Sequence, residues 1–311
     1  MPLDPHIAAL LQTMAEAGAP PMAEGTPDAG RAQFLALTAG ARSPEQVVPV
    51  ASSEDRTVPG AEGELRARVY RPEGEGPFPT VVFFHGGGWV IGDLDTHDNM
   101  ARTICRGSRA LVVAVDYRLA PEHPFPAATA DAVAAARWVA GHLDELGGDR
   151  RLAVAGDSAG GNLAAVVAQQ LHADGTAVTA QFLVYPAVDA AGEYPSRTEN
   201  GQGYFLEQAT MDWFYGHYAG AWDDAKDPRL SPLHAADLSG LPPALIVTAE
   251  FDPLRDEGAA YGEALRAAGV EAEVRCHAGM IHGFFDMAGA SPAARAAVEQ
   301  DCAGFGDLLH R

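Results

Sequence analysis

Lysine is almost absent from this sequence of 311 residues: Lys226 is the only one, so arginine carries nearly all of the positive charge. The chain has 21 Lys and Arg against 42 Asp and Glu, a formal net charge of -21 at pH 7. Such a charge makes nucleic acid and anionic membrane surfaces unfavourable partners. A salt-adapted source would give this composition, and so would a codon bias towards Ala, Gly and Arg; we favour the second.

Cysteine is also scarce, with one residue each at Cys105, Cys276 and Cys302. An odd number without a C-x-x-C motif or a His-rich neighbour argues against a disulfide framework and against a zinc site. We therefore expect no structural metal. Cys276 lies in a strand-like run and is expected to be a buried thiol.

Long apolar runs are missing as well. No segment approaches the roughly 18 apolar residues that a membrane span needs, and the N-terminus lacks a basic region, its first basic residue being Arg31. These absences predict a reduced, cytoplasmic protein. A length of 311 residues with 47% hydrophobic and 20% charged residues suits one large α/β domain, or one with an inserted subdomain.

Strand-like and helical patterns alternate along most of the chain. Residues 65–70 alternate in polarity, as a half-buried antiparallel strand does. Further strand-like runs, most of them continuously apolar, cover residues 80–84, 111–115, 152–155, 182–185, 245–248 and 271–276. Helical stretches cover about 98–108, 127–143, 160–173 and 257–268. This rhythm predicts an α/β fold with a mostly parallel sheet that helices cover on both sides.

Two segments fall outside that rhythm. Residues 1–50 hold two helix starts, each with a capping residue before a proline, Asp4-Pro5 and Thr26-Pro27. Residues 186–243 are too long for an ordinary crossover and are rich in aromatic residues. We interpret the second segment as a cap inserted into a catalytic domain of residues 51–185 and 244–311; a core-packed excursion without a role in binding is the alternative.

A serine lies between two glycines where an apolar run gives way to a helical pattern. Residues 156–160 read Gly-Asp-Ser-Ala-Gly. A strand, a sharp turn and a helix around G-x-S-x-G form a nucleophile elbow, in which side chains at the glycine positions would clash with neighbouring backbone. The pattern predicts that Ser158 is a nucleophile above a helix N-terminus, which favours developing negative charge.

Three consecutive glycines follow the apolar run 80–84, in His-Gly-Gly-Gly-Trp at residues 85–89. Since glycine has no Cβ, its backbone N–H can approach a substrate oxygen closely. This loop is a candidate oxyanion hole together with the N–H of Ala159, the residue after the serine. We expect His85 to shape the loop through hydrogen bonds.

A serine hydroxyl needs a general base and an acid that orients the base. His282 lies just beyond the last strand-like run, so the chain order would be Ser, acid, His. His277 is its nearest rival but abuts the strand end. For the acid, Asp252 lies in the loop that follows the run 245–248.

Three other carboxylates compete with Asp252. Asp256 and Glu257 fall in a first helical turn, where an acid ordinarily compensates the helix dipole. Glu250 is a minor rival. We therefore favour Asp252.

Five motifs together resemble the hormone-sensitive-lipase family of esterases, more narrowly its bacterial branch with Gly-Asp-Ser-Ala-Gly. They are His-Gly-Gly-Gly-Trp at 85–89, Tyr-Arg-Leu-Ala-Pro-Glu at 117–122, residues 156–162, Asp-Pro-Leu-Arg-Asp at 252–256 and His-Gly-Phe at 282–284. The resemblance covers about residue 64 to the end. It implies an α/β-hydrolase sheet of eight strands, with a helical cap built from residues 1–50 and 186–243.

The resemblance also assigns roles to residues. It maps a catalytic triad onto Ser158, Asp252 and His282. It maps the oxyanion donors onto three backbone N–H groups, with a fourth as substitute: Gly86, Gly87 and Ala159, or Gly88. It suggests a homodimer through the run 271–276 and the C-terminal helix.

The resulting hypothesis is a serine carboxylesterase that hydrolyses short-to-medium-chain acyl esters through an acyl-serine intermediate, without metal or organic cofactor. Four aromatic residues are candidates for substrate binding: Trp89, Tyr185, Phe205 and Phe214. The same machinery would serve a deacetylase or amidase acting on acetylated small molecules. A non-catalytic small-ligand receptor of this fold would be expected to lack the histidine.

Overall fold

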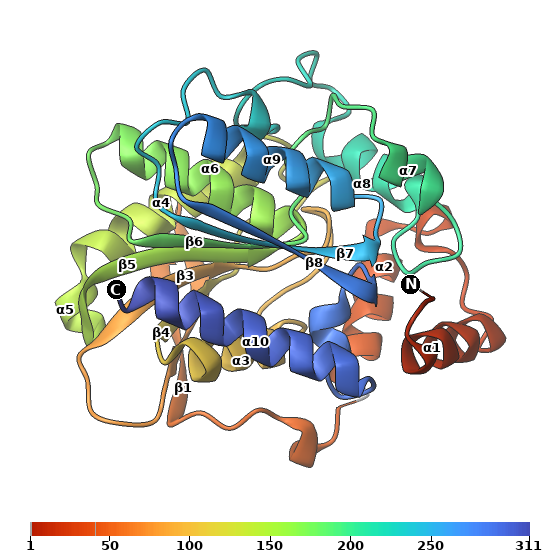
Figure 1. The fold of residues 1–311 in the computed structure, drawn as a ribbon, viewed down its shortest axis with the longest axis horizontal. Helices are drawn as coiled ribbons and strands as arrows, with labels where there is room; N and C mark the ends of the chain where they lie inside the picture. The colour runs from red at the N-terminus through yellow and green to blue at the C-terminus, as the bar shows by residue number, and fades with distance from the viewer. Residues whose placement is uncertain (1, 41) are drawn as a thin grey trace.

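The apolar runs of the sequence lie side by side in one eight-stranded sheet (Figure 1). The structure is a computed structural model that describes residues 2–40 and 42–311. The strands are β1 Ser52–Pro59, β2 Glu64–Arg71, β3 Phe78–Phe84, β4 Leu111–Val115, β5 Gly148–Asp157, β6 Ala180–Val184, β7 Ala244–Phe251 and β8 Ala272–Ile281. Their order is β1-β2-β4-β3-β5-β6-β7-β8. Strands β3 to β8 run parallel, and β2 is antiparallel to β1 and β4, which confirms the predicted mostly parallel sheet.

Strand β1 was not predicted from the sequence. It lies at one edge of the sheet, and of its residues only Val58 is buried. Without an alternation of apolar and polar residues, a strand of this kind leaves no periodic signal. Its partner β2 was recognised because Leu65, Ala67 and Val69 all face the core.

Helices cover both faces of the sheet. They are α1 Pro5–Glu16, α2 Pro27–Leu35, α3 Asp98–Ser108, α4 Ala127–Gly141, α5 Leu143–Leu146, α6 Ala159–Ala173, α7 Pro195–Glu199, α8 Gln208–Ala219, α9 Arg255–Ala267 and α10 Pro292–Leu309. Helices α3 and α10 pack against one face, and α4, α6 and α9 against the other (Figure 1). Both starts predicted near the N-terminus are confirmed, since Asp4 caps α1 and the Thr26 hydroxyl accepts the N–H of Ala29 in α2.

The segment of residues 186–243 connects β6 to β7 and contains α7 and α8. Its helices α7 and α8 lie with α2 near the carboxyl ends of β7 and β8, and the rest of the segment returns to the start of β7 (Figure 1). The two segments touch: a Cβ added at Gly30 in α2 would lie 3.6 Å from the ring of Trp213 in α8. This is an ordinary van der Waals distance, so α2 and α8 lie within packing distance of each other.

The prediction that Cys276 is buried is wrong. Its side chain is exposed because β8 is the other edge strand of the sheet, whereas Cys105 and Cys302 are buried thiols. Strand-like polarity alone does not tell an edge strand from a central one.

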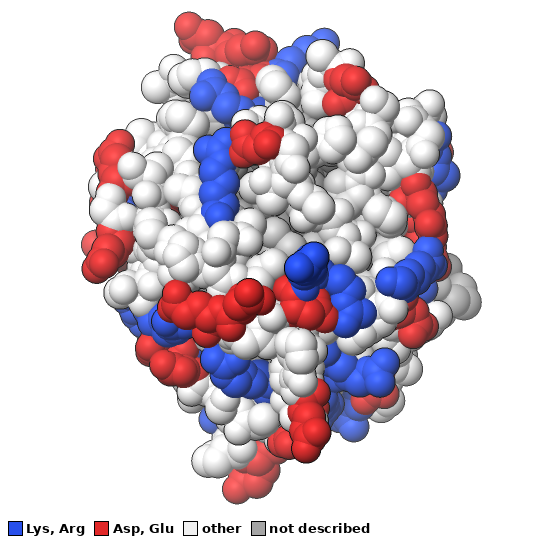
Figure 2. Space-filling view, turned by 90° about the vertical axis from the view of Figure 1, so that its left-hand side faces the viewer, with Lys and Arg blue, Asp and Glu red and all other residues white. Residues whose placement is uncertain are grey.

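Arginine side chains pair with carboxylates over the surface. The buried Asp131 accepts hydrogen bonds from the guanidinium of Arg118, which also reaches the exposed Glu62. On the face shown in Figure 2, Lys and Arg side chains are interspersed with Asp and Glu rather than gathered into a basic field. Among the described helices, none has both the length and the apolar character to cross a bilayer.

Candidate active site

Ser158 occupies the turn between β5 and α6 in a backbone conformation that few L-residues adopt, with φ 54° and ψ -119°. A Cβ at Gly156 would lie 2.2 Å from the carbonyl oxygen of Gly160, and one at Gly160 would lie 1.9 Å from that of Phe84. The strained turn is therefore open to glycine alone at these two positions. It is held by a hydrogen bond of 2.9 Å from the Ser158 N–H to the carbonyl of Val184 in β6.

The structure brings Ser158, His282 and Asp252 together at the carboxyl ends of β5, β8 and β7. His282 Nε2 lies 3.0 Å from Ser158 Oγ, and its Nδ1 lies 2.8 Å from Asp252 Oδ2. The other oxygen of Asp252 accepts the N–H of Leu254 at 2.8 Å. Asp252 is fully buried and His282 nearly so, which leaves the carboxylate little water to compete with the imidazole.

The rival residues are engaged elsewhere. His277 lies within β8 and its Nε2 is 2.7 Å from Asp301. Glu257 is fully buried and accepts from Arg197, so it does more than compensate a helix dipole at the surface. Glu250 accepts the N–H of Gly279 and Asp256 accepts that of Ser196.

The prediction that Gly86 donates to an oxyanion is wrong in this structure. Its N–H already donates to Asp157 Oδ1 at 2.8 Å, and a Cβ at Gly86 would lie 2.3 Å from the second carboxylate oxygen. The carboxylate of Asp157 also faces His97 Nε2 at 3.6 Å. Asp157 therefore anchors the loop of residues 85–89 through Gly86. The glycines of the motif alone do not predict this role.

Gly87 and Gly88 remain with backbone conformations that only glycine adopts easily. Their φ values are +111° and +57°. A Cβ at Gly87 would lie 2.2 Å from the carbonyl oxygen of Ile91, and one at Gly88 would lie 2.1 Å from the ring of Phe214. Ala159 is the first residue of α6, so its N–H is one of those that a helix leaves without an intrahelical acceptor.

Arg31 of α2 supports the same loop from the other side. Its Nε donates to the carbonyl of Val90 at 2.9 Å and its Nη2 to that of Ala120 at 3.0 Å. Both Nη atoms also reach the carboxylate of Glu122 at 2.7 Å. We did not anticipate this residue, because these three partners lie 59 to 91 positions away and no local pattern marks them.

Three of the four aromatic candidates border the catalytic groups. The ring of Tyr185 lies 4.5 Å from that of His282 between centroids. Phe214 packs on Gly88, and the ring of Phe205 lies 3.2 Å from the Cβ position of Gly283. Tyr185 directly follows β6, Phe214 belongs to α8, and Phe205 lies in the loop before α8.

Trp89, the fourth candidate, has packing contacts instead. Its indole stacks on Tyr218 at 4.4 Å and lies 5.5 Å from the ring of Tyr215. These contacts hold α8 against residues 85–89, which we call the glycine loop. We therefore do not include Trp89 in the pocket proposed below.

His85 shapes the loop from within the core. Its ring stacks on Tyr117 at 4.3 Å, and its Nδ1 lies 2.7 Å from the carbonyl oxygen of Gly86. Its Nε2 is buried and has no hydrogen-bond partner among the described residues. The pKa of His85 is lowered from 6.5 to about 4, mainly by burial and to a smaller extent by the neighbouring His97. The imidazole is therefore neutral in the folded protein over the physiological pH range.

Comparison with known proteins adds four similarities, one to a family model and three to individual proteins. A family model described as the α/β-hydrolase fold matches residues 81–286. The carboxylic ester hydrolase LipN of Mycobacterium tuberculosis is 45% identical over 303 residues, which cover 94% of this chain and 80% of LipN. The ethyl acetate hydrolase of Pseudomonas putida is 40% identical over 304 residues, covering 92% and 93%. The crystallised esterase of the hyperthermophile Pyrobaculum calidifontis superimposes with a TM-score of 0.91 at 43% identity, over 99% of each chain.

Acid should destabilise the fold through His85. The unfolded chain binds a proton near pH 6.5 that the buried imidazole takes up only near pH 4, so this contribution is complete above pH 6.5 and is lost as the pH falls towards 4. Its size is about 3 kcal/mol of unfolding free energy. Urea unfolding of the wild type and His85→Asn at several pH values measures it: the variant should lose less stability in acid. The exposed His6, as His6→Asn, is the control; equal pH dependence in all three proteins would contradict the assignment.

Proposed function

The chain belongs to the hormone-sensitive-lipase family of α/β-hydrolases and is a carboxylic ester hydrolase, and we propose that Ser158, Asp252 and His282 are its catalytic triad. The observation that carries the proposal is the continuous chain of hydrogen bonds from Asp252 through His282 to Ser158. It supplies a nucleophile, a base in reach of the hydroxyl proton, and a buried carboxylate that fixes the imidazole.

Acylation begins when Ser158 Oγ attacks the ester carbonyl carbon and His282 Nε2 takes the hydroxyl proton. Asp252 holds the ring with Nδ1–H towards its carboxylate and stabilises the imidazolium. The carbonyl oxygen becomes an oxyanion, which we assign to the N–H groups of Gly87, Gly88 and Ala159. Loss of one such donor typically costs roughly 3–4 kcal/mol of transition-state stabilisation.

The tetrahedral intermediate then collapses. The bond to the alkoxy oxygen breaks while the imidazolium of His282 gives its proton to that oxygen, and the alcohol leaves. Water next attacks the acyl-serine with the same histidine as base, and the second collapse releases the carboxylic acid and restores the Ser158 hydroxyl. No step in this cycle uses a metal or an organic cofactor.

Short-to-medium acyl esters are the substrates that this proposal favours. Tyr185, Phe205 and Phe214 surround the catalytic groups closely and leave an aromatic wall where a long acyl chain would have to extend. The name of the Pseudomonas relative, an ethyl acetate hydrolase, supports a small acyl group.

Residues 1–50 and 186–243 form the cap in this proposal, and residues 51–185 and 244–311 the catalytic domain. The contact of α2 with α8 and the packing of Phe214 on Gly88 support it, because both segments meet over the glycine loop. The cap would then determine which ester reaches Ser158.

A reducing compartment suits the protein. All three cysteines are free thiols, and two of them are buried. Disulfides form and persist mainly in oxidising compartments, so unpaired cysteines support a location inside the cell, which we propose to be the cytoplasm.

Substitution of His282 by glutamine should lower kcat for p-nitrophenyl butyrate by about 10⁴-fold or more, because the serine loses its base. His277→Gln is the matched control and should retain wild-type kcat, since that ring contacts Asp301 instead. Ser158→Ala should abolish turnover and also labelling by a fluorophosphonate probe, whose adduct maps to Ser158 in the wild type. Turnover by Ser158→Ala at the wild-type rate would refute the triad.

A series of p-nitrophenyl esters tests the acyl preference. We expect kcat/KM to be highest for short and medium chains and to fall steeply beyond about twelve carbons, where the chain must displace the aromatic wall. Phe214→Ala should shift the preference towards longer chains, while Trp222→Ala, at a half-exposed aromatic outside this wall, should leave the profile unchanged. A wild-type preference for chains beyond twelve carbons would contradict the proposal.

We also propose a homodimer through β8 and α10. Strand β8 forms one edge of the sheet, with partly exposed side chains along residues 272–278, and α10 contacts it through Arg275 and Asp301. An unpaired edge is a ready template for pairing with a second copy. Light scattering on the eluting protein should give twice the chain mass of 32.5 kDa; a monomer at micromolar concentration would refute this assembly.

A further inference from the structure

Helix α7 belongs to the segment of residues 186–243, yet its buried face contacts the loop that carries Asp252. Ser196 lies in the first turn of α7, and Asn200 is the residue that follows the helix as its C-cap. Ser196 is fully buried and Asn200 is 4% exposed. Thr198 and Glu199 are exposed on the other side. Two polar side chains are therefore buried here, and core packing alone does not explain why they are polar.

The hydrogen bonds of this pair end on backbone groups around Asp252. Ser196 Oγ donates to the carbonyl of Pro253 at 2.7 Å. Asn200 Nδ2 lies 3.2 Å from the carbonyl oxygen of Glu250 and 3.3 Å from that of Asp252 itself. Carbonyl groups before, at and after the acid therefore point to α7.

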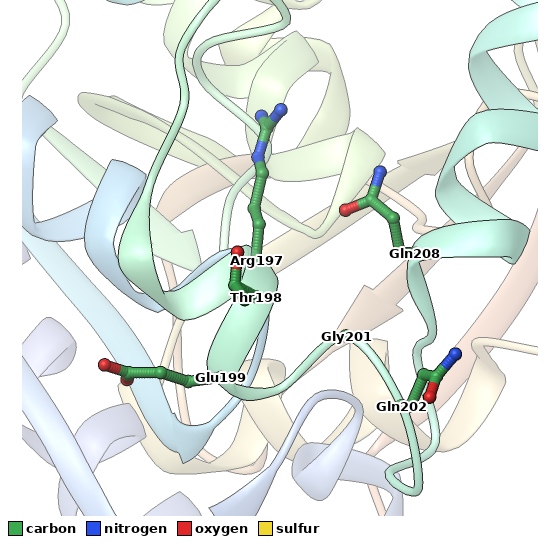
Figure 3. Close-up of a pocket in the computed structure, with 6 residues that line it drawn as sticks. All are labelled: Arg197, Thr198, Glu199, Gly201, Gln202 and Gln208. Atoms are coloured by element: carbon green, nitrogen blue, oxygen red, sulfur yellow. The ribbon is translucent and has the colours of Figure 1, made fainter.

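Two ion pairs fasten α7 to the start of α9, directly after the acid loop. Arg197 Nη2 lies 2.7 Å from the buried Glu257, whose other oxygen accepts the N–H of Val188 at 2.8 Å. Arg255 reaches Glu199 at 2.8 Å. On its outer side α7 borders a hollow of 620 Å³ that separates it from the start of α8 (Figure 3). The acid loop, and not α8, is thus the main support on which α7 rests.

The segment that follows α7 reaches the histidine loop. Phe205 packs against Gly283, the residue after His282, and Tyr204 lies 5.1 Å from the ring of Phe251 at the end of β7. One continuous stretch, residues 196–205, therefore contacts the loops of both the acid and the base.

We propose that Ser196 and Asn200 are positioning residues for the proposed triad: they hold the backbone of residues 250–253 so that the Asp252 carboxylate stays in line with His282. Within the described part of the chain, the carboxylate has one other hydrogen bond besides that to His282, from the N–H of Leu254 to its Oδ1. A small rotation of this backbone would lengthen the 2.8 Å contact to His282 Nδ1. The inference rests on the proposed function, because it gives these residues a task only if Asp252 orients the base.

The test compares Asn200→Asp and Ser196→Ala with the wild type. Asn200→Asp replaces a donor by an oxygen that repels both carbonyls, and Ser196→Ala removes the hydroxyl. We expect kcat for p-nitrophenyl butyrate to fall roughly 10- to 100-fold in each, the cost of a misplacement on the scale of 1 Å, with KM changed by less than about threefold. Ser196→Thr keeps the hydroxyl, so its kcat should stay close to that of the wild type, unlike that of Ser196→Ala. Thr198→Ala, on the outer side of the same helix (Figure 3), is the matched control and should retain it.

A second readout separates positioning from loss of folding. The exchangeable proton between His282 Nδ1 and Asp252 gives a downfield ¹H resonance, identified by its loss in His282→Gln. This resonance should shift or broaden in Asn200→Asp and Ser196→Ala while their urea unfolding stays cooperative.

Unchanged kcat in the folded variants, or a loss of kcat with an unchanged resonance, would overturn the inference. Failure of the proposed function looks different: Ser158→Ala would stay active. If Ser158→Ala is inactive and the α7 variants are normal, the triad stands and only the positioning role falls.

Discussion

A serine held at positive φ is the constraint on which the rest of the site depends. For a residue with a Cβ, the φ of 54° at Ser158 is unfavourable by about 1–2 kcal/mol, and the surrounding backbone must impose it. That backbone belongs to β5, which lies between β3 and β6 in the middle of the sheet, and to the buried start of α6. Gly156 and Gly160 remove the side chains that would hinder this close approach. The strain is thus located in the middle of the sheet, where strands on both sides hold the backbone.

The loops around the serine depend on polar anchors from distant parts of the chain. Asp157 holds Gly86 by its N–H, and Arg31 holds two carbonyls and a carboxylate at once. The planar guanidinium has five N–H donors, so one side chain can fix several acceptors in a defined geometry, which a lysine ammonium does less well. A chain that uses arginine in place of lysine therefore has the side chain that this support needs.

Sequence reasoning reached the central sheet and the order of Ser158, Asp252 and His282, because both have local signals. Buried parallel strands are apolar runs, and functional side chains follow where those runs end. It missed β1, whose residues are mostly exposed, and misjudged Cys276, because sheet order decides which strand is an edge. It also misjudged Gly86, because the group that engages its N–H lies 71 positions away. Contacts of this kind become visible only when the chain is folded.

The connection between β6 and β7 has a consequence for how such a protein can diversify. The connection joins two adjacent parallel strands, in which Gln181 pairs with Ala244. This pairing can form whatever the length of the connection. Doubling the length of a flexible loop costs only about 0.6 kcal/mol in closure entropy. Insertions would be tolerated unequally, however: the exposed residues 221–226 make few ties to the framework, whereas residues 196–205 contact the loops of the acid and the base. Insertions in residues 221–226 would therefore leave the catalytic loops in place, whereas insertions in residues 196–205 would displace them.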